Sequence, residues 1–207
     1  MEGPLGDTLT DSQSWYNSLV AGRSDRRGQL LSAARHVFSK KGYEEATVAE
    51  IVTRAGVAQG TFYLYFPGKE ALAGAFAELV SERLAELAEE KTARCRTFDT
   101  ALARLFEAAY ETADEHRDIF LIANRGTELL ADLDEWMNRT HPARSWLERF
   151  LESWQAQGAV DPRVRPAVTA RVLRDALDRA SRAYILFGDR NYGRDLGEVL
   201  RRGLAPA

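Results

Sequence analysis

The sequence predicts an all-α protein. No stretch has the alternating apolar and polar pattern of a half-buried strand. Apolar residues instead recur at three- and four-residue intervals through most of the chain after Ser24, which is the period of one helix face. Glycine and proline fall between these stretches, at positions where helices end or begin. The chain has 207 residues, of which 45% are hydrophobic, so it is long enough to bury such helices around a core.

The first expected helix follows an acidic arm. Residues 1–22 are mostly small and polar, with three acids and no bases, and we expect a flexible arm there. Ser24 can cap the helix that follows, and Gly42 can end it in the left-handed conformation that favours glycine. The apolar stripe of this helix consists of Leu30, Ala34, Val37 and Phe38.

Two short helices are expected next. Thr47 and Glu50 have the spacing of a capping box, in which each side chain satisfies a free backbone amide of the other residue. The helix that they start runs for about two turns, to Gly56. A further short helix is expected over residues 58–66, because Pro67 lacks an amide proton and disfavours helical backbone in the residue before it.

The rest of the chain is expected to form long amphipathic helices. Gly126 interrupts one of them, and Pro142 and Pro166 are good first residues for two others. The expected spans are residues 69–92, 98–116, 118–137, 142–157, 166–187 and 192–204. No internal repeat accompanies them.

Composition excludes several classes of function. The single cysteine, Cys95, rules out an internal disulfide or a cysteine-cluster metal site, and the three histidines lie far apart in sequence. No paired-carboxylate, nucleophile-elbow or phosphate-loop pattern is present, so we expect no enzymatic activity, no metal and no cofactor. No apolar run approaches the roughly 20 residues that span a bilayer, and no basic signal segment opens the chain. We therefore expect a cytoplasmic protein without a membrane partner.

Positive charge is concentrated in one segment of the chain. The net charge is −3, yet residues 23–69 carry eight bases and four acids. A small basic segment on an acidic body predicts a local contact with a polyanion.

A helix-turn-helix is the arrangement that best fits the two short helices and the glycine-containing turn between them. The motif is carried by FSKKGY at residues 38–43, ATVAEI at 46–51 and AGVAQGTFYLYFPGKE at 55–70. These stretches closely resemble the TetR family of one-component transcriptional regulators. The resemblance implies a head at residues 23–68 that binds double-stranded DNA. It also implies a helical body at residues 69–207 that binds an effector and forms a dimer.

The third helix has the two faces that a recognition helix needs. At about 100° per residue, Ala58, Phe62 and Phe66 lie on the core side. The opposite side carries Gly60, Thr61 and Leu64, with Gln59 and Tyr63 along one edge and Tyr65 along the other. Aromatic runs usually form core, but successive residues of a helix cannot all face inward, so the two tyrosines need another role.

This exposed side can contact DNA in the major groove. Gln59 can reach adenine, and the contact at Leu64, where a polar residue is common in the family, becomes apolar and suits a thymine methyl group. The resemblance further implies that Thr47 and Lys69 hold phosphates and that the tyrosines contact the DNA backbone. The expected DNA-binding residues are Thr47, Gln59, Gly60, Thr61, Tyr63, Leu64, Tyr65 and Lys69.

Two apolar stripes near the C-terminus suit a dimer interface. They occupy the expected helices at 166–187 and 192–204, and two such helices from each subunit would form a four-helix interface. Each stripe alone fits an intramolecular core equally well, but one short recognition helix reads too little DNA, so we favour a homodimer. The expected interface residues are Leu173, Ala176, Leu177, Ala180, Tyr184, Leu196, Val199 and Leu200.

A ligand pocket is expected where polar residues interrupt an apolar helix. Residues 124–128 separate two apolar runs, and Gly126 within them favours a bend that a ligand can occupy. A solvated helix junction explains this pattern equally well. The expected pocket residues are Phe106, Tyr110, Phe120, Asn124, Glu128 and Trp136, a lining that suits a hydrophobic or amphipathic small molecule.

These features together predict a homodimeric transcriptional regulator, expected to be a repressor that a small-molecule effector releases from DNA. The alternative is an interaction protein that keeps the helix-turn-helix fold and binds a protein partner through its body. Salt dependence separates the two, because binding that neutralises several phosphates weakens steeply with salt.

Overall fold

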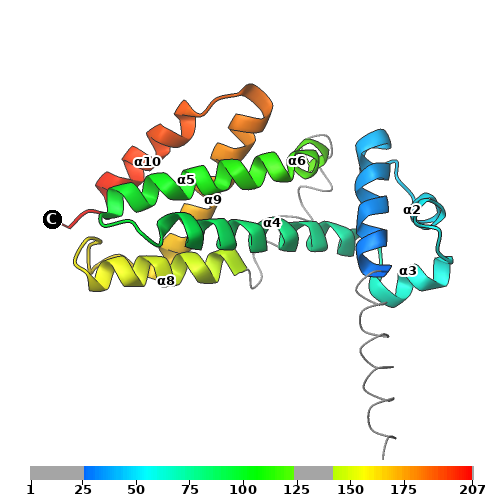
Figure 1. Ribbon diagram of the computed structural model, residues 1–207, viewed down its shortest axis with the longest axis horizontal. Coiled ribbons are helices and arrows are strands. Elements are labelled where there is room, and N and C mark those ends of the chain that lie inside the picture. Colours follow the sequence, from blue (N-terminus) through cyan, green and yellow to red (C-terminus); the bar gives the residue numbers. More distant parts are fainter. Residues whose placement is uncertain (1–25, 124–141, 207) are drawn as a thin grey trace, which may run out of the picture.

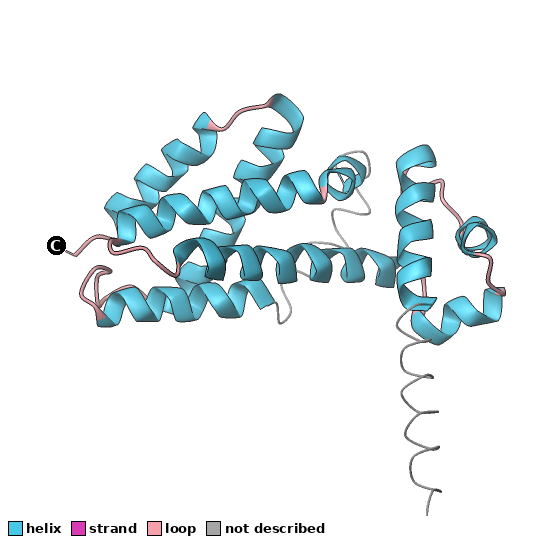
Figure 2. Ribbon diagram, in the orientation of Figure 1, coloured by secondary structure: helices cyan, strands magenta, loops and turns pink. Residues whose placement is uncertain are grey.

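The computed structural model describes residues 26–123 and 142–206. All regular elements in these two ranges are α-helices, as the sequence predicts (Figure 2). None of the described helices is long and apolar enough to cross a membrane. The predicted arm at residues 1–22 and the predicted cap at Ser24 lie outside the described residues.

Three helices form a small head at one end of the molecule (Figure 1). The first occupies residues 26–41 and is followed by α2 (Val48–Ala55) and α3 (Gln59–Tyr65). The predicted apolar stripe of the first helix is buried in the head core. Gly42 ends this helix at φ +89°, and its amide donates to the carbonyl of Phe38 over 2.8 Å.

Local sequence signals set the ends of α2 and α3. The Thr47 hydroxyl accepts from the amide of Glu50, and the Glu50 carboxylate accepts from the amide of Thr47 at 3.1 Å, which confirms the capping box. Gly56 ends α2 in the left-handed conformation, at φ +67°. The sequence places Ala58 on the core side of α3, but Ala58 is exposed, because it precedes the first turn in an extended conformation.

The body is built on α4 (Lys69–Thr92), which runs from the head toward the far end of the molecule (Figure 1). The other described helices of the body are α5 (Phe98–Glu115), α6 (Arg117–Ala123), α8 (Pro142–Ala156), α9 (Pro166–Phe187) and α10 (Asn191–Leu204). Their bounds match the predicted ones closely. The exception is the helix predicted at 118–137, which the structure describes only as far as Ala123.

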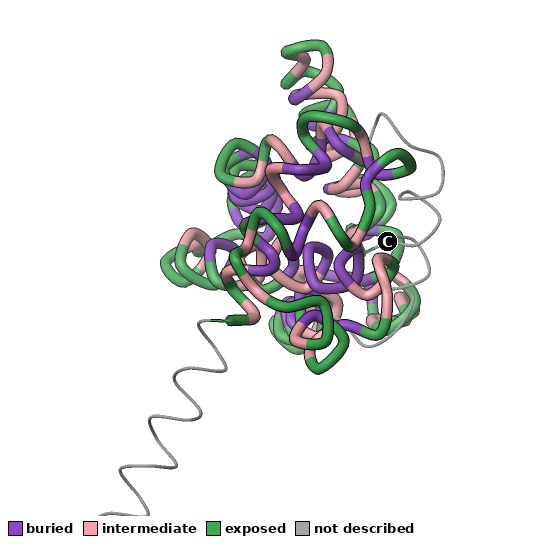
Figure 3. Tube along the Cα trace, turned by 90° about the vertical axis from the view of Figure 1, so that its right-hand side faces the viewer, coloured by how far each residue is buried: buried purple, intermediate pink, exposed green. Residues whose placement is uncertain are grey.

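The buried side chains form two main clusters, one in the head and one in the body. The head cluster joins the first three helices to the N-terminal part of α4, and it also takes in Ile119 and Ile122 from α6. The body cluster joins the C-terminal part of α4 to α5, α8 and α9, with an aromatic row at Trp146, Phe150 and Trp154. Figure 3 shows the buried segments gathered toward the middle of the molecule, with exposed segments around them. Helix α6 therefore follows α5 in the body but packs into the head core.

Close packing of α10 against α5 depends on two glycines. Gly193 lies against Tyr110 and Gly197 lies against Phe106, so both aromatic rings fit beneath the α10 backbone. The Tyr110 hydroxyl donates to the carbonyl of Arg190 at 3.2 Å, and the Arg190 guanidinium lies 5.3 Å from the centroid of the Tyr110 ring. These contacts fix the last helix on the body.

Replacing Gly193 with alanine is expected to destabilise the protein. A Cβ atom there would lie 2.0 Å from the Tyr110 hydroxyl and 3.0 Å from the Phe106 ring, so α10 or both rings must move. Overpacking of this kind costs about 1–3 kcal/mol. The matched control is Gly203→Ala in the same helix, where nothing lies within 4 Å of the added atom. Its higher helix propensity predicts a gain of up to about 1 kcal/mol. Urea unfolding measures both, and effects of the same sign would contradict this packing.

Candidate DNA interface and effector cavity

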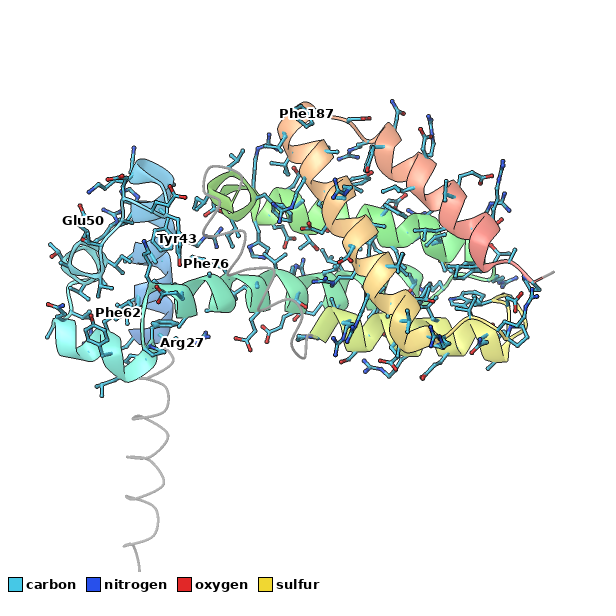
Figure 4. The ribbon with its side chains drawn as sticks, turned by 180° about the vertical axis from the view of Figure 1, so that it is seen from behind. Arg27, Tyr43, Glu50, Phe62, Phe76 and Phe187 are labelled. Atoms are coloured by element: carbon cyan, nitrogen blue, oxygen red, sulfur yellow. The ribbon has the colours of Figure 1, made fainter. Side chains whose placement is uncertain are left out.

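Aromatic side chains seat α3 on the head. Phe62 is fully buried, and its ring centroid lies 5.8 Å from that of Phe66, which is also buried. Tyr43 and Phe76 meet the ring of Phe38 edge-on, with centroid distances of 5.2 and 6.0 Å. Figure 4 shows Phe62 on α3, and Tyr43 and Phe76 beside the first helix. These buried rings hold the inner face of α3 and thereby fix the direction of its outer face.

The outer face of α3 is exposed and carries no charged side chain. Leu64 is 78% exposed and Tyr63 is 52% exposed. Gln59 and Gly60 are exposed at the start of the helix, and Thr61 is half-buried. The structure thus brings five of the predicted DNA-binding residues together on one accessible surface.

The other three predicted DNA-binding residues have structural contacts of their own. Tyr65 is half-buried against the head core, and Thr47 is exposed at the start of α2. Nζ of Lys69 donates to the carbonyls of Tyr43 at 2.8 Å and Glu44 at 3.2 Å, and lies 4.4 Å from the Tyr43 ring centroid. Lys69 therefore ties the start of α4 to the segment before α2, a positioning role that the sequence pattern did not reveal.

An ion pair holds α2 against the first helix. Nζ of Lys41 donates to the Glu50 carboxylate at 2.5 Å, and the same carboxylate takes part in the α2 cap. The hydrogen bond from Lys41, followed by those from the amide and hydroxyl of Thr47, lowers the pKa of Glu50 below its usual 4.5. The Glu50 carboxylate is therefore ionised at neutral pH and accepts hydrogen bonds from both Lys41 and Thr47.

A cavity inside the body is a second candidate site. It has a volume of about 70 Å³ and is lined by residues of α4, α5, α6, α8 and α9. Three hydroxyls in its wall bond to backbone atoms. Ser81 accepts from the Ala143 amide at 2.9 Å, Thr112 donates to the Ala108 carbonyl at 2.8 Å, and Ser181 donates to the Ala109 carbonyl at 3.2 Å. The remaining wall is largely apolar. Ligand pockets usually measure roughly 300–1,000 Å³, so a ligand has to enlarge this cavity.

Charged side chains lie on the α9 side of the cavity. Arg174, Asp178 and Arg182 all line it. Nε of Arg182 donates to Asp178 at 2.8 Å, and the Arg174 side chain, which is 12% exposed, pairs with Asp175. The cavity thus combines an apolar interior with two guanidinium groups and one carboxylate on one side.

Comparison with known proteins assigns both parts of the chain to one family. Residues 30–76 match the model of the bacterial regulatory proteins of the tetR family, and residues 102–195 match that of the tetracyclin repressor-like C-terminal domain. The chain is 31% identical over 189 residues to the uncharacterised HTH-type transcriptional regulator YvdT of Bacillus subtilis. The matched region covers 89% of this chain and 97% of YvdT. This chain belongs to the TetR family of transcriptional regulators. Its head is accordingly the DNA-binding domain of a TetR-family regulator.

Two further similarities concern proteins whose names or structures include a ligand. The chain is 30% identical over 147 residues to the A-factor receptor protein of Streptomyces griseus. The matched region covers 70% of this chain and 49% of that protein. Its fold is similar to that of the transcriptional regulator FadR from Bacillus subtilis in complex with stearoyl-CoA, with a TM-score of 0.62 and 21% identity. That likeness covers 86% of this chain and 96% of FadR.

The described residues of the predicted pocket lie in two different sites of the body. Of the three that the structure describes, Phe120 lines the cavity. Phe106 and Tyr110 do not, because they face α10 and line a separate groove of about 300 Å³ between α5 and α10. The structure therefore corrects the expectation of one shared pocket. Asn124, Glu128 and Trp136 lie outside the described residues.

The predicted dimer residues also divide into two groups. Leu173, Leu177 and Ala180 are buried within the chain, in the body cluster formed with α5 and α8. Assigning these three to an interface between TetR-family subunits was therefore wrong, because no second chain can reach them. The other residues of the predicted set are half-buried, at Ala176, Tyr184, Leu196 and Leu200, or exposed, at Val199.

Other apolar side chains of α9 and α10 are accessible. Val168 and Val172 on α9 are 47% and 53% exposed, and Val199 on α10 is 67% exposed. Phe187, at the end of α9, is 80% exposed and points away from the body (Figure 4). Helix α9 thus exposes Val168 and Val172 next to the buried Leu173 and Leu177, and the sequence pattern did not separate the exposed side from the buried one.

Helix α6 connects the cavity to the DNA-binding head. Ile119 and Phe120 line the cavity, while Ile119 and Ile122 belong to the head core. A bidentate ion pair strengthens this contact: Nε of Arg35, on the first helix, donates to Oδ2 of Asp118 at 2.6 Å, and its Nη2 donates to Oδ1. A displacement of α6 would therefore act directly on the first helix of the head.

Asp118→Asn is expected to weaken this connection in a pH-dependent way. Partial burial opposes ionisation of Asp118, but hydrogen bonding and charge from Arg35 outweigh it and lower the pKa of Asp118 below 3.8. The stabilisation by this carboxylate is therefore present above about pH 4 and is lost as the pH falls through the lowered pKa. We expect the wild type to exceed Asp118→Asn in stability by about 1 kcal/mol at pH 7. Urea unfolding at several pH values should show this difference vanish in acid; a constant difference would contradict the ion pair.

Proposed function

We propose that this regulator is a cytoplasmic repressor that a small molecule releases from its operator. The observation that carries this proposal is the position of α6, which forms part of the cavity wall and part of the head core. A ligand that enlarges the cavity by displacing α6 moves part of the head core with it. Operator binding changes only if the ligand has different affinities for the two arrangements of the head.

The cavity wall favours an amphipathic ligand. An apolar chain suits the wall formed by side chains such as Val80, Leu84 and Phe120, and an anionic group suits the side that carries Arg174 and Arg182. The similar fold of FadR, which binds stearoyl-CoA, supports long-chain acyl compounds as the first effectors to test.

Filling the cavity is expected to abolish the response to the effector. Ala109 is buried in the cavity wall on α5, whereas Ala103 is exposed on the same helix. We expect Ala109→Leu to bind the operator as the wild type does and to need at least about tenfold more stearate or stearoyl-CoA for release. The Ala103→Leu control should respond as the wild type does.

The readout is fluorescence anisotropy of a labelled operator, with the operator obtained by selection from random DNA. A thermal unfolding scan of each variant confirms that its fold is intact. Release of Ala109→Leu at the wild-type effector concentration would show that the cavity is not the effector site.

We also propose that the exposed apolar surface of α9 and α10 forms the dimer interface. Dimers are typical of the family. Val168, Val172 and Val199 give this surface its apolar character, and a second copy that covers them removes them from water. A dimer presents two copies of α3 to two half-sites. Half-sites separated by one helical turn of DNA have centres roughly 34–36 Å apart.

A further inference from the structure

The uncharged face of α3 limits which bases this helix can read. Its seven residues, QGTFYLY, include no arginine, lysine, aspartate or glutamate. Guanine is read most often by arginine or lysine, which donate to O6 and N7, and cytosine by an acidic side chain that accepts from N4. The helix therefore lacks the side chains that most often read a G·C pair.

Two exposed side chains of α3 are suited to the other base pair. Gln59 has the amide that makes a bidentate contact with N6 and N7 of adenine. Leu64 is the most exposed large apolar side chain of the head, and it offers no hydrogen bond to a base. The only methyl group that an unmodified base presents in the major groove is the C5-methyl group of thymine.

Gly60 allows Leu64 to come close to the bases. The two residues are four positions apart, so they lie on the same face of α3, one turn from each other. Nothing lies within 4 Å of the place where a Cβ atom of Gly60 would stand, so this face is open and has no side chain at Gly60 to hold the helix away from DNA. The buried rings of Phe62 and Phe66 keep this face directed outward.

We propose that the bases beneath α3 are A·T pairs, and that Leu64 packs on one thymine methyl group in each half-site. This inference rests on the proposed function, because it requires that α3 enters the major groove of a specific operator. Burial of the methyl group against Leu64 removes both from water, which favours thymine over every base that lacks the methyl group. Gln59 selects adenine independently, at a neighbouring position.

The experiment begins with the full-length protein and selection of an operator from random DNA. Each thymine of the selected half-site is then replaced, in both half-sites, by deoxyuridine, which keeps the base pairing and removes only the methyl group. We expect one position at which deoxyuridine weakens binding by about threefold to tenfold per half-site. In Leu64→Ala the same replacement should have almost no effect, because the methyl group has lost its partner.

Gln59→Ala is the matched control on the same helix. It should weaken binding and relax the preference for adenine, yet keep the full effect of deoxyuridine. If the protein selects an operator but no deoxyuridine position matters, or if Leu64→Ala keeps the wild-type sensitivity, the inference about Leu64 is wrong and the proposed function stands. A selected half-site with G·C pairs throughout the α3 contact would overturn the A·T assignment. If selection yields no operator, the proposed function itself fails.

Discussion

Replacing Phe62 with alanine is expected to destabilise the head strongly and to weaken operator binding. Phe62 is fully buried between α3 and the rest of the head. Removal of a buried phenylalanine side chain costs about 3–5 kcal/mol, because it loses apolar burial and leaves a cavity. Domains of this kind are stable by only about 5–15 kcal/mol, so the loss takes a large part of the total. Urea unfolding and operator binding measure the two consequences.

Leu64→Ala is the control for Phe62→Ala, because both residues lie on α3. Leu64 is 78% exposed, so its removal should change the free energy of unfolding by no more than about 0.5 kcal/mol. A Phe62→Ala variant that unfolds at the same urea concentration as Leu64→Ala would contradict the seating of α3 by aromatic side chains.

Val172→Asp is expected to convert the proposed dimer into a folded monomer. Val172 is 53% exposed in the single chain and lies one turn after Val168, which is also exposed on α9. In a dimer its replacement would place two carboxylates in an apolar interface, where an unpaired charge is strongly unfavourable. The monomer presents one recognition helix, so its affinity for the operator should fall steeply. Sedimentation velocity at micromolar concentration measures the oligomeric state.

Leu64→Asp controls for the change of charge in Val172→Asp. It also places an aspartate at an exposed aliphatic position, but on the DNA-binding face. We expect this variant to stay dimeric and to lose operator binding, because a carboxylate in the major groove is repelled by the negative charge of the DNA and loses the contact with the methyl group. If Val172→Asp stays dimeric at the same concentration, another surface forms the interface.

Most of the fold could be predicted from local signals in the sequence. The capping box at Thr47, the left-handed glycines at Gly42 and Gly56, and the prolines that begin α8 and α9 act within a few residues of chain. Such signals set helix bounds whatever the tertiary structure. The exposed side of α3 could also be predicted, because the helical period separates it from Phe62 and Phe66.

The contacts between distant segments could not be predicted from the sequence. Arg35 and Asp118 are 83 positions apart, and many other pairs of opposite charge occur in the chain. The separation of Phe106 from Phe120 depends on the close approach of α10, which two glycines allow. Helix α9 carries both buried and exposed apolar residues. The periodic pattern of the sequence does not show which of them face the core.

We expect this regulator to bind one DNA sequence in preference to others. The most direct test is a gel shift of the purified protein with the DNA that flanks its own gene, at two salt concentrations, followed by selection from random DNA if the flanks are not bound. We predict a discrete complex that resists competitor DNA and weakens with salt, with a slope of about −0.9 in log K against log salt for each phosphate neutralised. Binding that prefers neither the flanks nor any selected sequence over random DNA would contradict this expectation and favour a protein-binding function for the body.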